Sequence, residues 1–144
     1  MSNTRLLSKL LHLKELRIKW FVFKDHGKEL HSGVKPYQNG CLCPECGQRG
    51  WIVRPATDER TWTDIAVFGL QVILHYAPKE IACRTHGRIQ EEIPWAAVRA
   101  RVSSRLEFRV CALSQIMTQK AASEILEMPS STVSDILHRV INRV

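Results

Sequence analysis

Two short segments with metal-ligand spacing constrain this chain more than any other feature. The segment CPECG (residues 43–47) is followed by CRTHG (residues 83–87), with 36 residues between Cys46 and Cys83. In each, two ligand-type residues stand three positions apart, so both donor atoms can face one ion, and the glycine that follows takes a left-handed backbone without steric cost. Three thiolates and one imidazole close a tetrahedral shell and leave no open position for chemistry. The pattern predicts one structural Zn²⁺ per chain, held by Cys43, Cys46, Cys83 and His86.

Other interpretations of the cysteines stay open at this point. They are buried thiols without a metal, an iron site of the rubredoxin kind, and a redox pair that cycles through a disulfide. The chain has five cysteines, and an odd number in a reducing compartment favours ligands or buried thiols over disulfides. Cys41 stands two residues before the first ligand, on the opposite side of an extended chain, and we expect it not to bind metal. Cys111 falls within an apolar helical pattern and is expected to be a small core residue.

Composition and charge limit the class of protein. The 144 residues are 44% hydrophobic and 24% charged, as in ordinary globular proteins. Charged residues interrupt the amphipathic N-terminus, so we expect no signal peptide, no membrane association and a cytoplasmic protein. The net charge of +7 favours a polyanionic partner, since each neutralised phosphate releases condensed counterions. A basic surface that is merely solvated is the alternative.

The first two thirds of the chain have mainly β character after one helix. Residues 4–16 carry leucines at helical spacing. Residues 17–35 are predicted to form a β-hairpin around the turn at Asp25–Gly27, with Ile18, Trp20 and Val22 on one face and Lys19, Phe21 and Phe23 on the other. Further strands are predicted at residues 51–54, 61–65, 70–76, 79–83 and 88–93.

The last third is predicted to be helical. A first helix at 104–117 places Leu106, Val110, Leu113 and Met117 on one stripe, and shorter helices follow at about 118–127 and 131–143. The last two have the pattern of a helix-turn-helix, with small residues at Ala122 and Ser123. The predicted packing positions are Leu126, Met128, Val133 and Ile136.

The turn between these two helices has one unusual residue. Pro129 ends the first helix, and Ser130 or Ser131 is expected to cap the second. Glu127 occupies a position where glycine often makes the turn, so the turn must tolerate a side chain there.

In this register the second helix presents polar side chains to a DNA major groove. The predicted DNA contacts on it are Ser130, Ser131, Ser134, Asp135, His138 and Arg139. Arg101, Arg105 and Arg109 recur every four residues along the preceding helix, and we expect them to form a phosphate-contacting edge. An ordinary three-helix bundle with a solvated polar face is the alternative.

Together these segments predict an α+β fold in two parts. Residues 1–94 hold the N-terminal helix, the β-hairpin and a zinc ribbon of short antiparallel strands, and residues 95–144 hold a three-helix helix-turn-helix bundle. The aspartates at 25, 58, 64 and 135 fall in predicted turns or at a helix start, and no converging pair for Mg²⁺ is apparent. The other five histidines are scattered along the sequence and are given no metal role. We therefore expect a protein that is not an enzyme and takes no small-molecule substrate.

The order of these segments resembles a known family. CPECG, then RTWTDIAVFGLQVILHYAPKEIACRTHGRIQEEIPW, then the helix-turn-helix, is similar to the N-terminal region of bacterial insertion-sequence transposases of the ISL-three type, over residues 10–144. The resemblance implies a zinc-binding domain with Cys43, Cys46, Cys83 and His86 as ligands. It also implies that residues 118–141 bind the terminal repeats of the mobile element.

The same resemblance implies a function and its partners. In that family a DDE-type catalytic domain follows, with its metal-binding carboxylates at positions beyond Val144, the last residue here. We therefore expect a non-catalytic, sequence-specific DNA-binding module of a truncated transposase, associated with the bacterial nucleoid. Its expected partners are double-stranded DNA at element ends and either a second copy or a full-length transposase. The alternative is a protein-interaction or regulatory module that acts on a transposase or on transcription.

Overall fold

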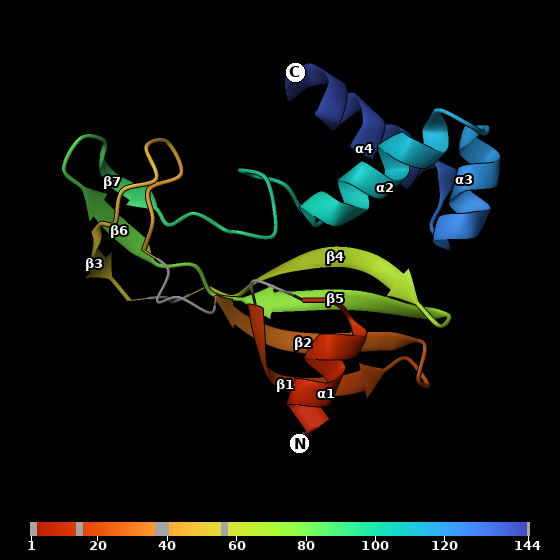
Figure 1. Ribbon diagram of the computed structural model, residues 1–144, viewed down its shortest axis with the longest axis horizontal. Helices are drawn as coiled ribbons and strands as arrows, with labels where there is room; N and C mark the ends of the chain where they lie inside the picture. Colours follow the sequence, from red (N-terminus) through yellow and green to blue (C-terminus); the bar gives the residue numbers. More distant parts are fainter. Residues whose placement is uncertain (1–2, 14–15, 37–40, 56–57, 144) are drawn as a thin grey trace.

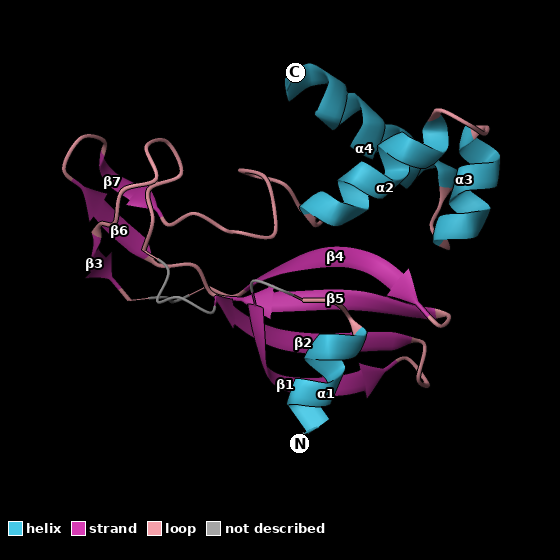
Figure 2. Cartoon of the chain, viewed as in Figure 1, coloured by secondary structure: helices cyan, strands magenta, loops and turns pink. Residues whose placement is uncertain are grey.

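The structure, a computed structural model, describes residues 3–13, 16–36, 41–55 and 58–143. These residues form two β-sheets and four helices (Figures 1 and 2). The predicted α+β class is confirmed. Figure 1 shows the smaller sheet at one end of the molecule, and the larger sheet lies beside helices α2 to α4.

The larger sheet combines two hairpins. Its strands are β1 (Leu16–Lys24), β2 (Glu29–Pro36), β4 (Arg60–Val67) and β5 (Leu70–Tyr76), in the order β1-β2-β5-β4. The β1–β2 and β4–β5 pairs are antiparallel, which confirms the predicted hairpin, and β2 and β5 join the hairpins as a parallel pair. The prediction of a zinc ribbon from the strands after residue 50 is wrong in part. Strands β4 and β5 join the β1–β2 hairpin and do not pair with the strands beside the cysteines.

The N-terminal helix is shorter than predicted. Helix α1 spans Asn3–Leu10, and β1 begins at Leu16, so the prediction of a helix to residue 16 is wrong. His12 has a φ of 53°, a left-handed conformation that ends a right-handed helix. Leu11, which the predicted helix included, lies after α1 and is buried in the core.

A β-bulge in β1 changes which side chains face the core. The register with β2 shifts between Ile18 and Trp20, so that Ile18 lies opposite Val34 and Trp20 opposite Gly33. An extra residue in one strand turns the following side chains to the other face. Ile18 is buried and Phe21 packs against the core, whereas Trp20 is 41% exposed. The predicted face of Ile18, Trp20 and Val22 is therefore wrong beyond Ile18.

The main hydrophobic core lies on one face of the larger sheet, under α1 and a segment that follows the β region. The Trp62 indole meets the Trp95 ring edge-on, with ring centroids 5.3 Å apart, a preferred aromatic geometry. The buried residues are Leu11, Leu16, Ile18, Leu30, Val34, Trp62, Val72, Leu74, Trp95, Ala96 and Ala100. Segment 95–100, directly after the predicted domain boundary, thus packs on the sheet.

The smaller sheet contains β3 (Trp51–Arg54), β6 (Glu80–Cys83) and β7 (Gly87–Gln90), all antiparallel, in the order β3-β6-β7. The last predicted strand, 88–93, ends at Gln90. The next residue, Glu91, has a buried carboxylate that accepts three hydrogen bonds from other segments.

Three helices pack around a second core. Helix α2 spans Ser104–Ser114, α3 spans Gln119–Leu126 and α4 spans Ser130–Arg143. The N-caps of α2 and α3 are Ser103 and Thr118, whose hydroxyls accept backbone N–H bonds. The buried residues are Leu106, Val110, Ala122, Leu126, Val133 and Ile136, with Leu113, Met117 and Met128 packed against them. The predicted packing positions are confirmed, although α2 ends three residues before Met117.

The connection between α3 and α4 differs from the prediction at the cap. The helix α4 begins at Ser130, and the Pro129 carbonyl accepts the N–H groups of Thr132 and Val133. The Ser130 hydroxyl donates to Ser123 Oγ, 3.2 Å away, and so ties the two helices together. A cap by Ser130 or Ser131 is therefore not how α4 begins.

Glu127 makes the turn with a left-handed backbone, with φ 57° and ψ 43°. A side chain in this region costs about 1–2 kcal/mol compared with glycine. Because glycine also loses more chain entropy on folding, we expect Glu127→Gly to raise the free energy of unfolding by about 1 kcal/mol, measured by urea denaturation. The matched control is Glu124→Gly, an exposed glutamate inside α3, which should lower stability by about 1 kcal/mol. Equal effects at both positions would contradict this account of the turn.

Candidate metal centre

The four predicted ligands lie together. Their donor atoms are all within 4.8 Å of one another. Cys43 Sγ is 3.5 Å from His86 Nδ1, Cys83 Sγ is 3.7 Å from the same nitrogen, and Cys46 Sγ is 3.5 Å from Cys83 Sγ. A tetrahedral zinc with Zn–S bonds of about 2.3 Å places its donors about 3.5–3.8 Å apart. The arrangement can therefore hold a metal ion such as zinc.

Local backbone geometry forms both turns that carry the ligands. Gly47 and Gly87 have φ of 72° and 70°, the left-handed conformation that the sequence predicts for them. In the first turn the Gly47 N–H donates to the Cys43 carbonyl at 2.8 Å, and the Cys43 N–H donates to the Gln48 carbonyl at 2.9 Å. The second turn connects β6 to β7, with Cys83 paired to Gly87.

A carboxylate orients the histidine ligand, and sequence reasoning missed it. Glu45, inside the first turn, places Oε2 3.2 Å from His86 Nε2, so His86 Nδ1 faces the sulfurs. A carboxylate that bonds the other ring nitrogen sets the ring orientation of a metal-bound histidine. The backbone N–H of His86, with its imidazole and the Thr85 N–H, lowers the pKa of the Cys83 thiol to about 6. A lowered pKa favours the thiolate, the form of the sulfur that binds metals.

The smaller sheet has almost no hydrophobic core of its own. Neither core cluster contains a residue of β3, β6 or β7. Ile81 is fully buried, but Trp51 is 56% exposed and Ile52 is half-exposed. Three short strands cannot bury enough apolar surface for independent stability. We therefore expect a bound metal ion to supply the stability that the core of this sheet cannot.

Cys41 lies next to the four ligands but not among them. Its backbone N–H donates to Glu91 Oε2 at 3.0 Å, and Glu91 Oε1 accepts the Tyr76 hydroxyl and the Lys79 N–H. Burial and this carboxylate raise the pKa of Tyr76 above its ordinary value. Glu91 thus links Cys41, two residues before the first ligand, to Tyr76 at the end of β5.

Most of the predicted DNA-contact residues lie on the exposed side of the helical part. Ser130, Ser131, Asp135, His138 and Arg139 are exposed on α4, and Ser134 is half-buried. His138 Nδ1 contacts the Ser134 carbonyl at 2.8 Å. Arg101 is exposed in the segment before α2.

Arg105 is placed differently from the prediction. Its guanidinium donates to both carboxylate oxygens of Asp64 and to the Leu11 carbonyl. The prediction that Asp64 lies in a turn is wrong. It is fully buried in β4, where its carboxylate also accepts the Ser103 hydroxyl at 2.7 Å. The Arg105 guanidinium is thus paired within the protein, and its contact with phosphate stays a prediction.

The histidines are not all scattered. His31 and His75, 44 residues apart in sequence, lie with Nδ1 and Nε2 2.7 Å apart on neighbouring strands. No sequence signal predicts this contact, which depends on the parallel pairing of β2 with β5.

Comparison with known proteins finds no matching protein family, curated protein or solved structure. Among the described residues, no helix has both the length and the apolar character needed to cross a membrane.

Proposed function

We propose that this chain is a non-catalytic, zinc-stabilised module that binds double-stranded DNA through α4. The observation that carries the proposal is the division of α4 into two faces. Val133 and Ile136 are buried against α2 and α3, while Ser131, Asp135 and Arg139 are exposed. An exposed polar helix held by a second helix across a short turn suits insertion into a major groove.

Charge supports a nucleic-acid partner. Residues 94–144 contain seven Lys/Arg and four Asp/Glu, a balance of +3. Two of the arginines are neutralised by buried acids, Arg105 by Asp64 and Arg143 by Glu107. Arg101, Arg109 and Arg139 are exposed, and cations of this kind release counterions when they meet phosphates.

We propose zinc as the metal. Three sulfurs and one imidazole nitrogen form the donor set, and the soft ligands and near-tetrahedral spacing suit Zn²⁺ better than the oxygen-loving cations. With all four positions taken by protein ligands, the ion serves folding.

The resemblance to transposases of the ISL-three type suggests the DNA target. On this proposal α3 and α4 recognise the terminal repeats of a mobile element, and the chain acts in the bacterial cytoplasm on or beside the nucleoid. The order along the chain supports this target: the two turns that carry the metal ligands come first, and the three helices follow.

The test of DNA binding uses selection from a pool of random duplexes, followed by gel retardation with the selected duplex. We expect one enriched sequence and an affinity that falls steeply as salt rises. Arg139→Ala should weaken binding about tenfold, the loss of one contact of about 1.4 kcal/mol. Lys28→Ala, an equal charge change in the β1–β2 turn, is the control and should leave the affinity nearly unchanged. Absence of retardation at low salt would refute the proposal.

A second candidate function, docking onto another protein, is favoured by four exposed apolar side chains of the helical part. They are Phe108, Ile116, Ile125 and Ile141. Exposed apolar residues in this number suit a partner surface, such as a second copy or a transposase subunit. Self-association in sedimentation experiments, together with no retardation of any duplex, would favour this function over DNA binding.

A further inference from the structure

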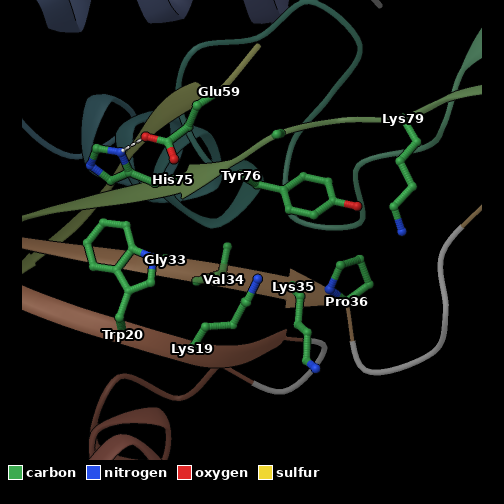
Figure 3. Close-up of a pocket in the computed structure, with 11 residues that line it drawn as sticks. Lys19, Trp20, Gly33, Val34, Lys35, Pro36, Glu59, His75, Tyr76 and Lys79 are labelled. Carbon is green, nitrogen blue, oxygen red and sulfur yellow. Dashed lines mark hydrogen bonds and ion pairs between the residues drawn. The ribbon is translucent and has the colours of Figure 1, made fainter. Parts of the chain in front are cut away.

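A second site lies on the larger sheet, far in sequence from the helical part. Its centre is a row of three residues across neighbouring strands: Trp20 on β1 lies opposite Gly33 on β2, and Gly33 lies opposite His75 on β5. The bulge in β1 is what brings Trp20 into this row, on the face away from the main core. Figure 3 shows the indole and the imidazole beside each other in a cleft.

Gly33 allows the Trp20 indole to lie against the sheet. A Cβ built at Gly33 would be 2.0 Å from Trp20 Nε1 and 2.2 Å from Cε2. A side chain at position 33 would therefore occupy the space of the indole ring. The result is a flat aromatic surface that is still 41% exposed.

A chain of four side chains holds His75 in place. His31 Nε2 is 2.9 Å from Glu29 Oε2, His31 Nδ1 is 2.7 Å from His75 Nε2, and His75 Nδ1 is 2.7 Å from Glu59 Oε1. Both ring nitrogens of His75 are thus engaged, so the residue presents its ring and not a free base. Its centroid lies 5.3 Å from that of Trp20, which supports the indole from one side.

The cleft beside this aromatic surface has a cationic lining. Its volume is about 320 Å³, and Lys19, Lys35 and Lys79 line it with one acid, Glu59. The lysines come from β1, β2 and the segment before β6 (Figure 3). Within the described part of the chain, none of the three ammonium groups forms an ion pair. Three lysines against one acid, beside a stacking surface, favour a ligand that has both phosphate and an aromatic ring.

We propose that this cleft binds one nucleotide unit of a single-stranded nucleic acid, with the base stacked on Trp20 and the phosphates between the lysines. Its volume is at the small end of ligand pockets, too small for a duplex. Stacking on an aromatic side chain within a positive groove is the general means of holding a single strand without reading its sequence. The site is separate from α4 and does not depend on duplex recognition there.

The test measures binding of a fluorescent oligo-dT by anisotropy, using the zinc-loaded full chain. Trp20→Ala should weaken binding about tenfold, whereas Trp20→Phe should keep most of the affinity, because a ring remains for stacking. Gly33→Ala keeps the tryptophan but displaces its indole, and it should weaken binding as Trp20→Ala does. The double variant Lys19→Ala/Lys35→Ala should weaken binding and reduce its salt dependence.

Matched controls lie on the same strand. Phe23 and Lys24 are exposed on β1 outside the cleft, and Phe23→Ala and Lys24→Ala should bind oligo-dT as the unchanged protein does. Retardation of the selected duplex should be the same in all these variants, so failure of this proposal is distinguishable from failure of DNA binding by α4. Equal losses in the controls, or oligo-dT binding that survives both Trp20→Ala and Gly33→Ala, would overturn it. So would tight binding of the mononucleotide dTMP together with no binding of oligo-dT.

Discussion

Replacing Cys83 with alanine should abolish stoichiometric zinc binding and unfold the β3-β6-β7 sheet while α2 to α4 stay folded. The sulfur is one of four donors within 4.8 Å of one another, and structural zinc in small domains contributes on the order of 10 kcal/mol. The sheet cannot replace this from its own core, because Ile81 is its one fully buried aliphatic residue among those described. The helices have a separate core and should survive.

Zinc content per chain and limited proteolysis would measure these effects. Unchanged protein should hold one zinc, and cleavage of Cys83→Ala should concentrate in the smaller sheet. The control is Cys41→Ala, since Cys41 contacts Glu91 through its backbone N–H, which alanine keeps. If Cys41→Ala loses zinc as Cys83→Ala does, or Cys83→Ala retains one zinc per chain, the ligand set is wrong.

The second large effect is expected at Arg105, at the junction of the sheet and the helices. Among the described residues, Arg105→Ala leaves the buried Asp64 carboxylate with the Ser103 hydroxyl as its one side-chain hydrogen-bond donor. Removing one member of a buried ion pair costs about 3–5 kcal/mol, because the remaining charge is not compensated. We expect a loss of this size in the free energy of unfolding, measured by urea denaturation.

Two variants make the Arg105 result specific. Arg109→Ala, an exposed position one turn along α2, should change stability by less than about 0.5 kcal/mol. Asp64→Leu combined with Arg105→Met replaces both charges with apolar groups and should recover part of the loss. If Arg105→Ala is as stable as the unchanged protein, the pair does not join the sheet to the helices. A loss of duplex binding without a loss of stability would support Arg105 as a phosphate contact.

Local patterns were sufficient for much of this protein. The CPECG and CRTHG segments predict both metal turns and their glycines, since ligand spacing and a positive φ are properties of five consecutive residues. The packing face of α3 and α4 follows from helical periodicity, which places Leu126 and Val133 inside. These features need no knowledge of the rest of the chain.

Long-range pairing decided the remainder. Trp20, Gly33 and His75 meet only because β2 pairs in parallel with β5 and a bulge shifts β1 by one residue, and neither event has a local signature. Asp64 and Arg105 are 41 residues apart, and each looks like an ordinary surface charge in sequence. The two segments with metal-ligand spacing thus predict where a metal binds. Which charges are free for a nucleic acid, and which are used inside the fold, depends on contacts that only the packed chain creates.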